Sequence, residues 1–289
     1  MPPGGCVGAY GPYPLSNTPY RIFLESWLPE CYPISGQKCS QDLVVSALKI
    51  SGGLENDGAL TNSGTVNITF YFQGNGTYIQ TAGQTTNKAS MVQASVDIEG
   101  GTFSQQGGAL TATGIVNKGT FIAGGAITVS DKFQNYGKLS GNGTIQGVLE
   151  NHGIVSPGSS PGTMAVIGDY TQDASGSLVL ELGGLTQGVQ YDLMSITGTA
   201  NLQGTLEVDL YGGFTPSNGD EFTFLTADGG RSGTFDSYDL PFGPSYWNII
   251  YGTNDVTLVY SDVPEPATIM LLATGALGLF RYTRRHRRK

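Results

Sequence analysis

The fold is indicated by residues 133–153, FQNYGKLSGNGTIQGVLENHG, which contain one five-residue pattern twice. The pattern is an apolar residue, any residue, Asn, any residue and Gly. It occurs at residues 54–58, 60–64, 115–119, 133–137 and 149–153. Its glycines at 119, 137 and 153 are 18 and 16 residues apart. A repeat of that length is typical of one coil of a parallel β-solenoid. We expect Asn and Gly at its corners, where these residues adopt positive φ.

Between these corners the sequence predicts short strands. In residues 119–123 and 126–129, apolar and polar residues partly alternate, as expected for one buried and one solvated face. A coil cannot bury its apolar face alone, so coils are stable only as a stack. The sequence therefore predicts an all-β chain with a right-handed parallel β-solenoid over residues 51–163. An antiparallel sandwich with Gly-rich hairpins is the alternative.

The stretch SPGSSPG at 156–162 predicts a break after the repeats. Beyond it the alternation is longer, with leucines sharing a face in 178–182 and again in 206–210, and aromatic residues are concentrated there. Longer strands and larger core residues would cover the open end of a solenoid. We therefore predict a β-rich cap over residues 164–262. Residues 1–50 have no clear assignment.

The net charge of −9 on this 289-residue chain combines two unlike parts. Residues 281–289 contain six basic residues and no acid, which gives +6. The rest of the chain contains eight basic residues and all 23 acids, which gives −15. A body this acidic has no basic stripe that could follow phosphates, so we expect no nucleic-acid binding.

Three features follow one another at the C-terminus, over residues 263–289. A Pro-Glu-Pro motif comes first, then residues 267–280 without a charge, then an Arg-rich end. As a single hydrophobic helix the apolar run would span about 21 Å, short of the roughly 30 Å hydrocarbon core. Basic residues mark the cytoplasmic side of such a segment. The predicted site residues are Pro264, Glu265 and Pro266 in the motif; Ala267, Leu271, Leu272, Gly275, Leu277, Gly278 and Phe280 in the membrane segment; and Arg281, Arg284, Arg285, Arg287, Arg288 and Lys289 in the basic anchor.

This order of features resembles the PEP-CTERM sorting signal of Gram-negative bacteria. The resemblance implies that exosortase, a membrane protease-transpeptidase, recognises Pro-Glu-Pro and releases or transfers the mature protein. It implies a location in the cell membrane during sorting and afterwards at the cell surface or in a secreted extracellular matrix, with extracellular polysaccharide as a further partner. Segments between 156 and 235, among them Tyr191-Asp192-Leu193, also resemble passenger-like segments of autotransporters.

Proteins with such a signal are expected to begin with a secretory signal peptide. The first residues, Met1-Pro2-Pro3-Gly4-Gly5-Cys6, contain neither a basic region nor an apolar run of the required length. We therefore expect the true start of the protein to differ from the first residue of this sequence.

The sequence offers little chemistry. Its two histidines are His152, inside an Asn-His-Gly corner, and His286, in the basic tail. Acidic pairs such as Glu207 and Asp209 have the spacing of a solvated strand face. The cysteines lack the short spacings of a zinc site, although Cys31 and Cys39 are candidates for a disulfide. We predict no catalytic residue, no metal and no cofactor. Further acidic pairs are Asp220 with Glu221 and Asp236 with Asp239.

These observations predict an exported, exosortase-processed structural or adhesive protein of the cell surface or extracellular matrix, without enzyme activity. One alternative is a polysaccharide lyase or hydrolase built on a β-solenoid. A second is a protein that binds ice or polysaccharide through ranks of threonine. Threonines do cluster at 85–86, 111–113 and 197–199, but these groups do not recur with the coil period.

Overall fold

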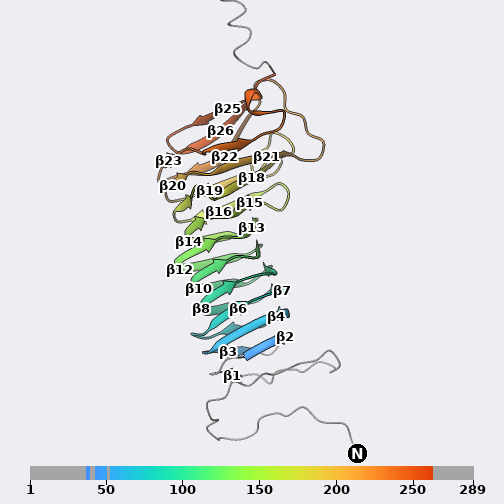
Figure 1. Cartoon of the computed structure of the whole chain (residues 1–289), viewed down its shortest axis with the longest axis vertical. Coiled ribbons are helices and arrows are strands. Elements are labelled where there is room, and N and C mark those ends of the chain that lie inside the picture. The colour runs from blue at the N-terminus through green and yellow to red at the C-terminus, as the bar shows by residue number, and fades with distance from the viewer. Residues whose placement is uncertain (1–36, 40–42, 51–52, 263–289) are drawn as a thin grey trace, which may run out of the picture.

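The computed structural model describes residues 37–39, 43–50 and 53–262, which form a column of stacked β-coils with the strands running across its long axis (Figure 1). The fold is all-β, and among these residues the only helix is a single 3-10 turn. The elements are β1 (Gln37–Cys39), β2 (Leu43–Ile50), β3 (Leu54–Asn56), β4 (Ala59–Ile68), β5 (Phe72–Gln73), β6 (Thr77–Gln80), β7 (Gln84–Asn87), β8 (Met91–Ile98), β9 (Thr102–Gln105), β10 (Ala109–Asn117), β11 (Thr120–Ala123), β12 (Ala126–Asn135), β13 (Lys138–Gly141), β14 (Thr144–Asn151), β15 (Ile154–Pro157), β16 (Thr163–Ile167), β17 (Tyr170–Gln172), β18 (Ser177–Leu182), β19 (Leu193–Ile196), β20 (Ala200–Leu202), β21 (Thr205–Leu210), β22 (Glu221–Ala227), β23 (Arg231–Gly233), β24 (Ser237–Asp239), η1 (Pro244–Tyr246), β25 (Trp247–Tyr251) and β26 (Asp255–Tyr260).

Each coil lies in parallel register on the one before it. Ile115 of β10 pairs with Val96 of β8 below and with Phe133 of β12 above, and Phe133 pairs in turn with Leu149 of β14. Successive partners are 18 and 16 residues apart for Asn117, Asn135 and Asn151. The predicted parallel β-solenoid and its period are therefore confirmed, and these parallel ladders exclude the antiparallel sandwich for the repeats.

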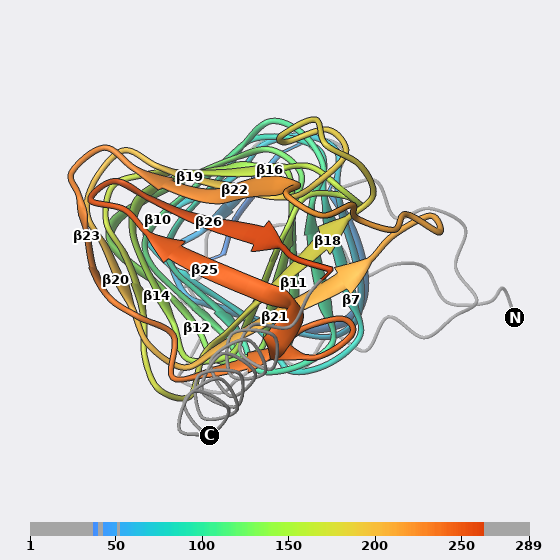
Figure 2. The same cartoon turned by 90° about the horizontal axis from the view of Figure 1, so that it is seen from above.

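A coil has three straight runs. The long strand β12 contributes two of them, because its pairing with β14 shifts register between Thr128 and Lys132, and the short strand β13 contributes the third. Viewed along the column, the coils enclose a three-sided interior (Figure 2). Side chains that point inward from all three runs make one continuous core.

Aromatic rings form part of that core and contact one another from coil to coil. The rings of Phe103 and Phe121 are stacked with centroids 5.0 Å apart, and Phe121 meets Phe133 edge-on at 5.1 Å. Tyr78 meets Phe103 edge-on at 6.0 Å. Each of these side chains is fully buried, which contributes about 1.5–3 kcal/mol per ring to folding. Such contacts join coils that could not bury an apolar face alone.

The repeated Asn residues line the interior and do not occupy positive-φ corners. Asn117, Asn135 and Asn151 are fully buried at strand ends, and the only described residues other than Gly with positive φ are Ser160 and Phe242. Nδ2 of Asn117 donates to Oδ1 of Asn135 at 2.7 Å, and Nδ2 of Asn135 donates to Oδ1 of Asn151 at 2.8 Å. The expectation of Asn corners was therefore wrong, because the Asn side chains point inward and are hydrogen-bonded to one another between coils.

The repeated glycines are required for a different reason from the expected one. Neither Gly137 nor Gly153 has a positive φ. A Cβ on Gly137 would lie 2.1 Å from the carbonyl oxygen of Gly119, and a Cβ on Gly153 would lie 2.3 Å from that of Gly137. The coils approach so closely at this corner that only a residue without a side chain fits.

Parallel pairing continues beyond the break predicted at residues 156–162. Strand β15, which ends inside the stretch at Pro157, pairs in parallel with β13 and β18, and β16, after it, pairs in parallel with β14 and β19. The rest of the stretch is a loop inserted into one coil, and a loop outside the ladder leaves the register intact. Within residues 164–262, parallel coils extend to β24, and antiparallel pairs join β22 to β26 and β26 to β25 at the end of the column (Figures 1 and 2).

Candidate functional site

The residues predicted to carry sorting, 264–289, lie outside the described residues, as do the predicted N-terminal segment up to residue 36 and Cys6 and Cys31. The structure does describe the point from which the sorting residues leave the body. That point is the end of β26, at residues 260–262, on top of the antiparallel cap (Figure 1).

Backbone hydrogen bonds fix this exit. The amide of Tyr260 donates to the carbonyl of Asp220 at 2.9 Å, and the carbonyl of Tyr260 accepts from the amide of Gly219 at 2.9 Å. One residue further, the amide of Ser261 donates to the carbonyl of Tyr246 at 2.9 Å. The amide of Asp262 donates to Oδ1 of Asn218 at 3.1 Å. The chain is thus tied to the cap up to the residue before Val263.

Aromatic side chains surround the exit, and we call Phe242, Tyr246, Trp247 and Tyr260 the aromatic end. The ring of Tyr260 lies 5.0 Å from that of Trp247, 6.0 Å from that of Phe242 and 6.4 Å from that of Tyr246, centroid to centroid. Nε1 of Trp247 donates to the carbonyl of Pro241 at 2.8 Å. Burial, together with the nearby carboxylate of Asp262, raises the pKa of the Tyr260 hydroxyl.

Phe242 differs from the rest of the aromatic end. Its side chain is 53% exposed, whereas Trp247 and Tyr260 are buried. Its φ is +63°, in the left-handed region that bulky residues avoid. The neighbouring Gly243 has a φ of +95°, and its amide donates to the carbonyl of Leu240 at 3.1 Å. A tight turn therefore holds an exposed ring beside the exit at a cost in backbone strain.

The sequence that follows β26 identifies the segment attached to this end of the body. Residues 262–288 match the family model described as the PEP-CTERM protein-sorting motif. The chain carries a PEP-CTERM sorting signal. The motif begins at Asp262, the last residue that the structure describes, whose amide is hydrogen-bonded to the cap. It indicates an exported protein that is sorted by exosortase and anchored in a membrane before processing, and the body of that protein is a β-solenoid.

No curated protein matches the chain, so no relative suggests a function for the solenoid body. In the part of the chain that the structure describes, no helix is both long and apolar enough to cross a membrane. The predicted membrane segment at 267–280 lies outside that part. Its residues and those of the basic anchor stay a prediction from the sequence.

His152 is held between two carboxylates. Its Nδ1 lies 2.5 Å from Oδ2 of Asp173, and its Nε2 lies 3.9 Å from Oε2 of Glu150. Its ring stacks on Tyr136 with centroids 4.5 Å apart. Burial opposes ionisation of Asp173, but hydrogen bonds from Ser175 and His152 outweigh it and lower the pKa of that carboxyl. Both ring nitrogens face acids of the protein itself, and Nδ1 is engaged by Asp173 in a contact between neighbouring coils.

The acidic pairs noted in the sequence lie on the solvated faces or in turns. Glu207 lies beside Asp239 of the next coil, and Asp209 lies beside Glu181 of the previous one. Oδ2 of Asp236 accepts from the amide of Gly204 at 2.7 Å, a structural role that the sequence did not reveal. Among the described residues, no three His, Cys, Asp or Glu side chains are grouped as a metal site requires.

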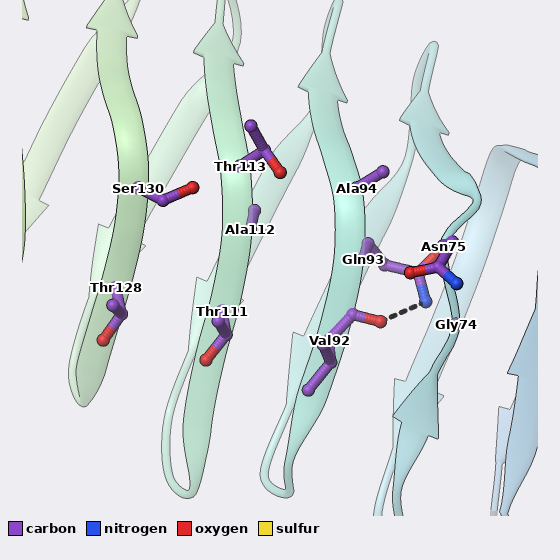
Figure 3. A pocket seen from close by; sticks show the side chains of 10 residues that line it. All are labelled: Gly74, Asn75, Val92, Gln93, Ala94, Thr111, Ala112, Thr113, Thr128 and Ser130. Carbon is purple, nitrogen blue, oxygen red and sulfur yellow. Dashed lines mark hydrogen bonds between the residues drawn. The ribbon is translucent and has the colours of Figure 1, made fainter.

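Two shallow hollows mark the outside of the column. The first, about 230 Å³, lies over β8, β10 and β12 and is lined by neutral side chains (Figure 3). Thr111 and Thr128 are direct partners in adjacent coils on its floor, but the same position is Val92 in the coil before and Gln146 in the coil after, so the threonines form one pair. The second, about 330 Å³, contains Lys138 and Glu181. Pockets for small ligands usually occupy 300–1,000 Å³ and enclose the ligand; the first hollow is smaller than this range and the second is at its lower end.

The loop at 156–162 is fastened by a buried carboxylate. Oδ1 of Asp192 accepts from the amide of Gly162 at 2.7 Å, and Oδ2 accepts from the amide of Glu181 at 2.8 Å. Asp192 is completely buried. Burial raises the pKa of this carboxyl to about 7, against the opposing effect of the two amide donors. In the sequence, Tyr191-Asp192-Leu193 stands out only by its resemblance to passenger-like segments. The hydrogen-bond partners of Asp192 are 30 and 11 residues away along the chain, so neighbouring residues do not predict its role.

Proposed function

We propose that the protein is a non-catalytic structural or adhesive element of the bacterial cell surface or extracellular matrix. The observation that carries the proposal is that the sorting motif follows in sequence directly on the strand that caps the column. A stack of coils with a continuous core and a polar exterior suits a spacer that presents its sides to a hydrated matrix. The acidic body favours solubility and disfavours binding to phosphate polymers.

The sorting step is tested by the mass of the mature protein. The chain is fused to a secretory signal peptide and expressed together with a sorting enzyme, with and without Glu265→Gln, and the C-terminus of the exported protein is read by mass spectrometry. We expect loss of residues after the Pro-Glu-Pro motif in the unaltered chain and retention of them in Glu265→Gln. The matched control is Glu221→Gln, an exposed glutamate of the cap. Recovery of intact protein ending at Lys289 in the cytoplasm would contradict the proposal.

The absence of catalysis is tested with a panel of acidic and neutral polysaccharides. We expect no release of reducing ends by the purified protein. Release that is abolished by Glu207→Gln with Asp239→Asn would instead support the hydrolase or lyase reading, because these two acids are neighbours on adjacent coils.

Binding of a neutral polysaccharide is a second candidate function, favoured by the Thr111 and Thr128 partners on the floor of the first hollow. Affinity electrophoresis in gels that contain matrix polysaccharide measures it. We expect Thr111→Glu to remove any retardation. Thr120→Glu is the control, because Thr120 is equally half-buried and belongs to β11, on another face of the coil.

A further inference from the structure

We infer that the aromatic end is a contact surface for the lipid headgroup layer, which seats the C-terminal end of the column on the membrane while the sorting motif is processed. The inference rests on the proposed insertion of residues 267–280 in that membrane. It adds a second contact, made by the folded body.

The first argument is the short distance that the chain can span between the cap and the apolar segment. Asp262, the last residue that the structure describes, is tied to the cap, and the apolar segment begins five residues later, at Ala267. Five residues span at most about 18 Å when fully extended. When the segment is in the bilayer, the cap therefore stays within that distance of its first residue. The motif Pro264-Glu265-Pro266 lies in the same short interval, so exosortase meets it at the membrane surface beside the cap.

The second argument is the chemistry of the surface that this tether brings to the membrane. Phe242 projects a half-exposed ring backed by Tyr246 and Tyr260, both with a hydroxyl. Aromatic side chains with one apolar and one polar part concentrate at membrane interfaces. Residues 232–262 contain no Lys or Arg and four aspartates, so we expect a zwitterionic headgroup layer and not an anionic one.

The third argument is strain. A phenylalanine at a φ of +63° is costly, and a glycine at position 242 would remove the cost. Strain that persists at an exposed ring indicates that the ring has a use outside the fold. Elsewhere on the column, Phe70 is exposed to a similar extent, 50%, without a positive φ. It precedes β5, near the opposite end of the described column, so it provides a matched control.

The experiment uses the full chain with Trp27→Phe and Trp247→Phe, which removes both native tryptophans. One protein then carries Phe242→Trp and the other carries Phe70→Trp. Each is bound to phosphatidylcholine and phosphatidylethanolamine vesicles in which part of the lipid is brominated near the headgroup, and bromine quenches tryptophan at short range. We expect loss of fluorescence for Phe242→Trp and none for Phe70→Trp. Both proteins are first compared with the unaltered chain by thermal unfolding.

Several outcomes separate the inference from its premise. Failure of both proteins to bind vesicles would contradict membrane insertion of the tail. Binding without quenching of Phe242→Trp would overturn the contact itself, as would equal quenching at both positions. In the absence of lipid, the fluorescence of Phe242→Trp could shift to the blue as the protein concentration is raised. That result would show that the aromatic end binds a second copy of the chain instead of lipid. Both proteins carry Trp247→Phe, so loss of the hydrogen bond from Nε1 of Trp247 to the carbonyl of Pro241 affects them equally, and the comparison of thermal unfolding identifies a folding defect before quenching is compared.

Discussion

Nδ2 of Asn135 donates a hydrogen bond to Oδ1 of Asn151 in the next coil over 2.8 Å, and both side chains are completely buried. The same carboxamide group accepts from Asn117 through its oxygen. Asn151 continues the series to Gln172 at 3.3 Å. Each member also donates to a backbone carbonyl, as Asn135 does to that of Ile154. The ladder therefore joins coils side chain to side chain where the backbone turns.

We expect Asn135→Ala to lower the free energy of unfolding by about 2–3 kcal/mol, because buried partners on both sides lose a hydrogen bond. Urea unfolding followed by circular dichroism measures the change. The control is Asn67→Ala, an exposed Asn in β4, for which we expect about 0.5 kcal/mol or less. Equal effects at the two positions would show that the ladder contributes nothing.

Gly137→Ala is expected to destabilise the column by about 1–3 kcal/mol, because its Cβ would overlap the carbonyl oxygen of Gly119 and force the coils apart. Gly114→Ala tests whether any glycine in the repeats is equally sensitive. The nearest atom to a Cβ there is the carbonyl oxygen of Lys132, at 3.8 Å, and φ is not positive. Thermal unfolding should therefore show a lower midpoint for Gly137→Ala and an unchanged or higher one for Gly114→Ala.

Asp192 makes stability depend on pH. Its pKa rises from an ordinary value of 3.8 to about 7 on folding, so the folded state favours the protonated carboxyl. The stabilisation is fully present below pH 4 and is lost as the pH rises through 7, at about 1.4 kcal/mol for each unit by which the pKa is raised. Unfolding midpoints measured from pH 4 to 8 should fall in the native protein. The fall should be smaller in Asp192→Asn and unchanged in Asp209→Asn, whose carboxyl is exposed.

Phe242→Gly is expected to raise the free energy of unfolding by about 1 kcal/mol, because left-handed backbone costs about 1–2 kcal/mol in a residue with a side chain and half of the lost ring was already in water. Differential scanning calorimetry on the native and altered chains measures it. A clear loss of stability would mean that the ring packs on the cap more tightly than its exposure indicates.

The sequence predicted the stacking because its period is a property of neighbouring residues along the chain. Glycines at 119, 137 and 153 mark equivalent positions in three coils, and the structure places them directly above one another. The sequence did not predict why they are needed, since the atom that excludes a side chain belongs to the previous coil. For the same reason Asn was assigned to exposed corners. Its local preference for turns is visible in one coil, whereas the ladder exists only between coils.

The candidate site was predicted to a different extent. Pro264, Glu265 and Pro266 were read directly from a linear motif, and the family match covers them. The aromatic end was not foreseen, because Phe242, Tyr246 and Tyr260 come together only when β25 and β26 pair and turn the chain back over the column. Asp192 escaped notice for a similar reason, as its two amide partners lie in other coils or strands.

The number of residues per coil changes along the column, and this bears on the height of the molecule. Equivalent residues are 16 apart between Asn135 and Asn151 but 30 apart between Tyr170 and Ala200. Every coil nevertheless adds one strand spacing to the height, about 4.8 Å, because additional residues go into loops at the side. The height of the column therefore depends on its number of coils and not on its number of residues. Duplicating one 18-residue unit would lengthen the column by one strand spacing, about 4.8 Å. Lengthening the loop at 156–162 would widen the column and leave its height unchanged.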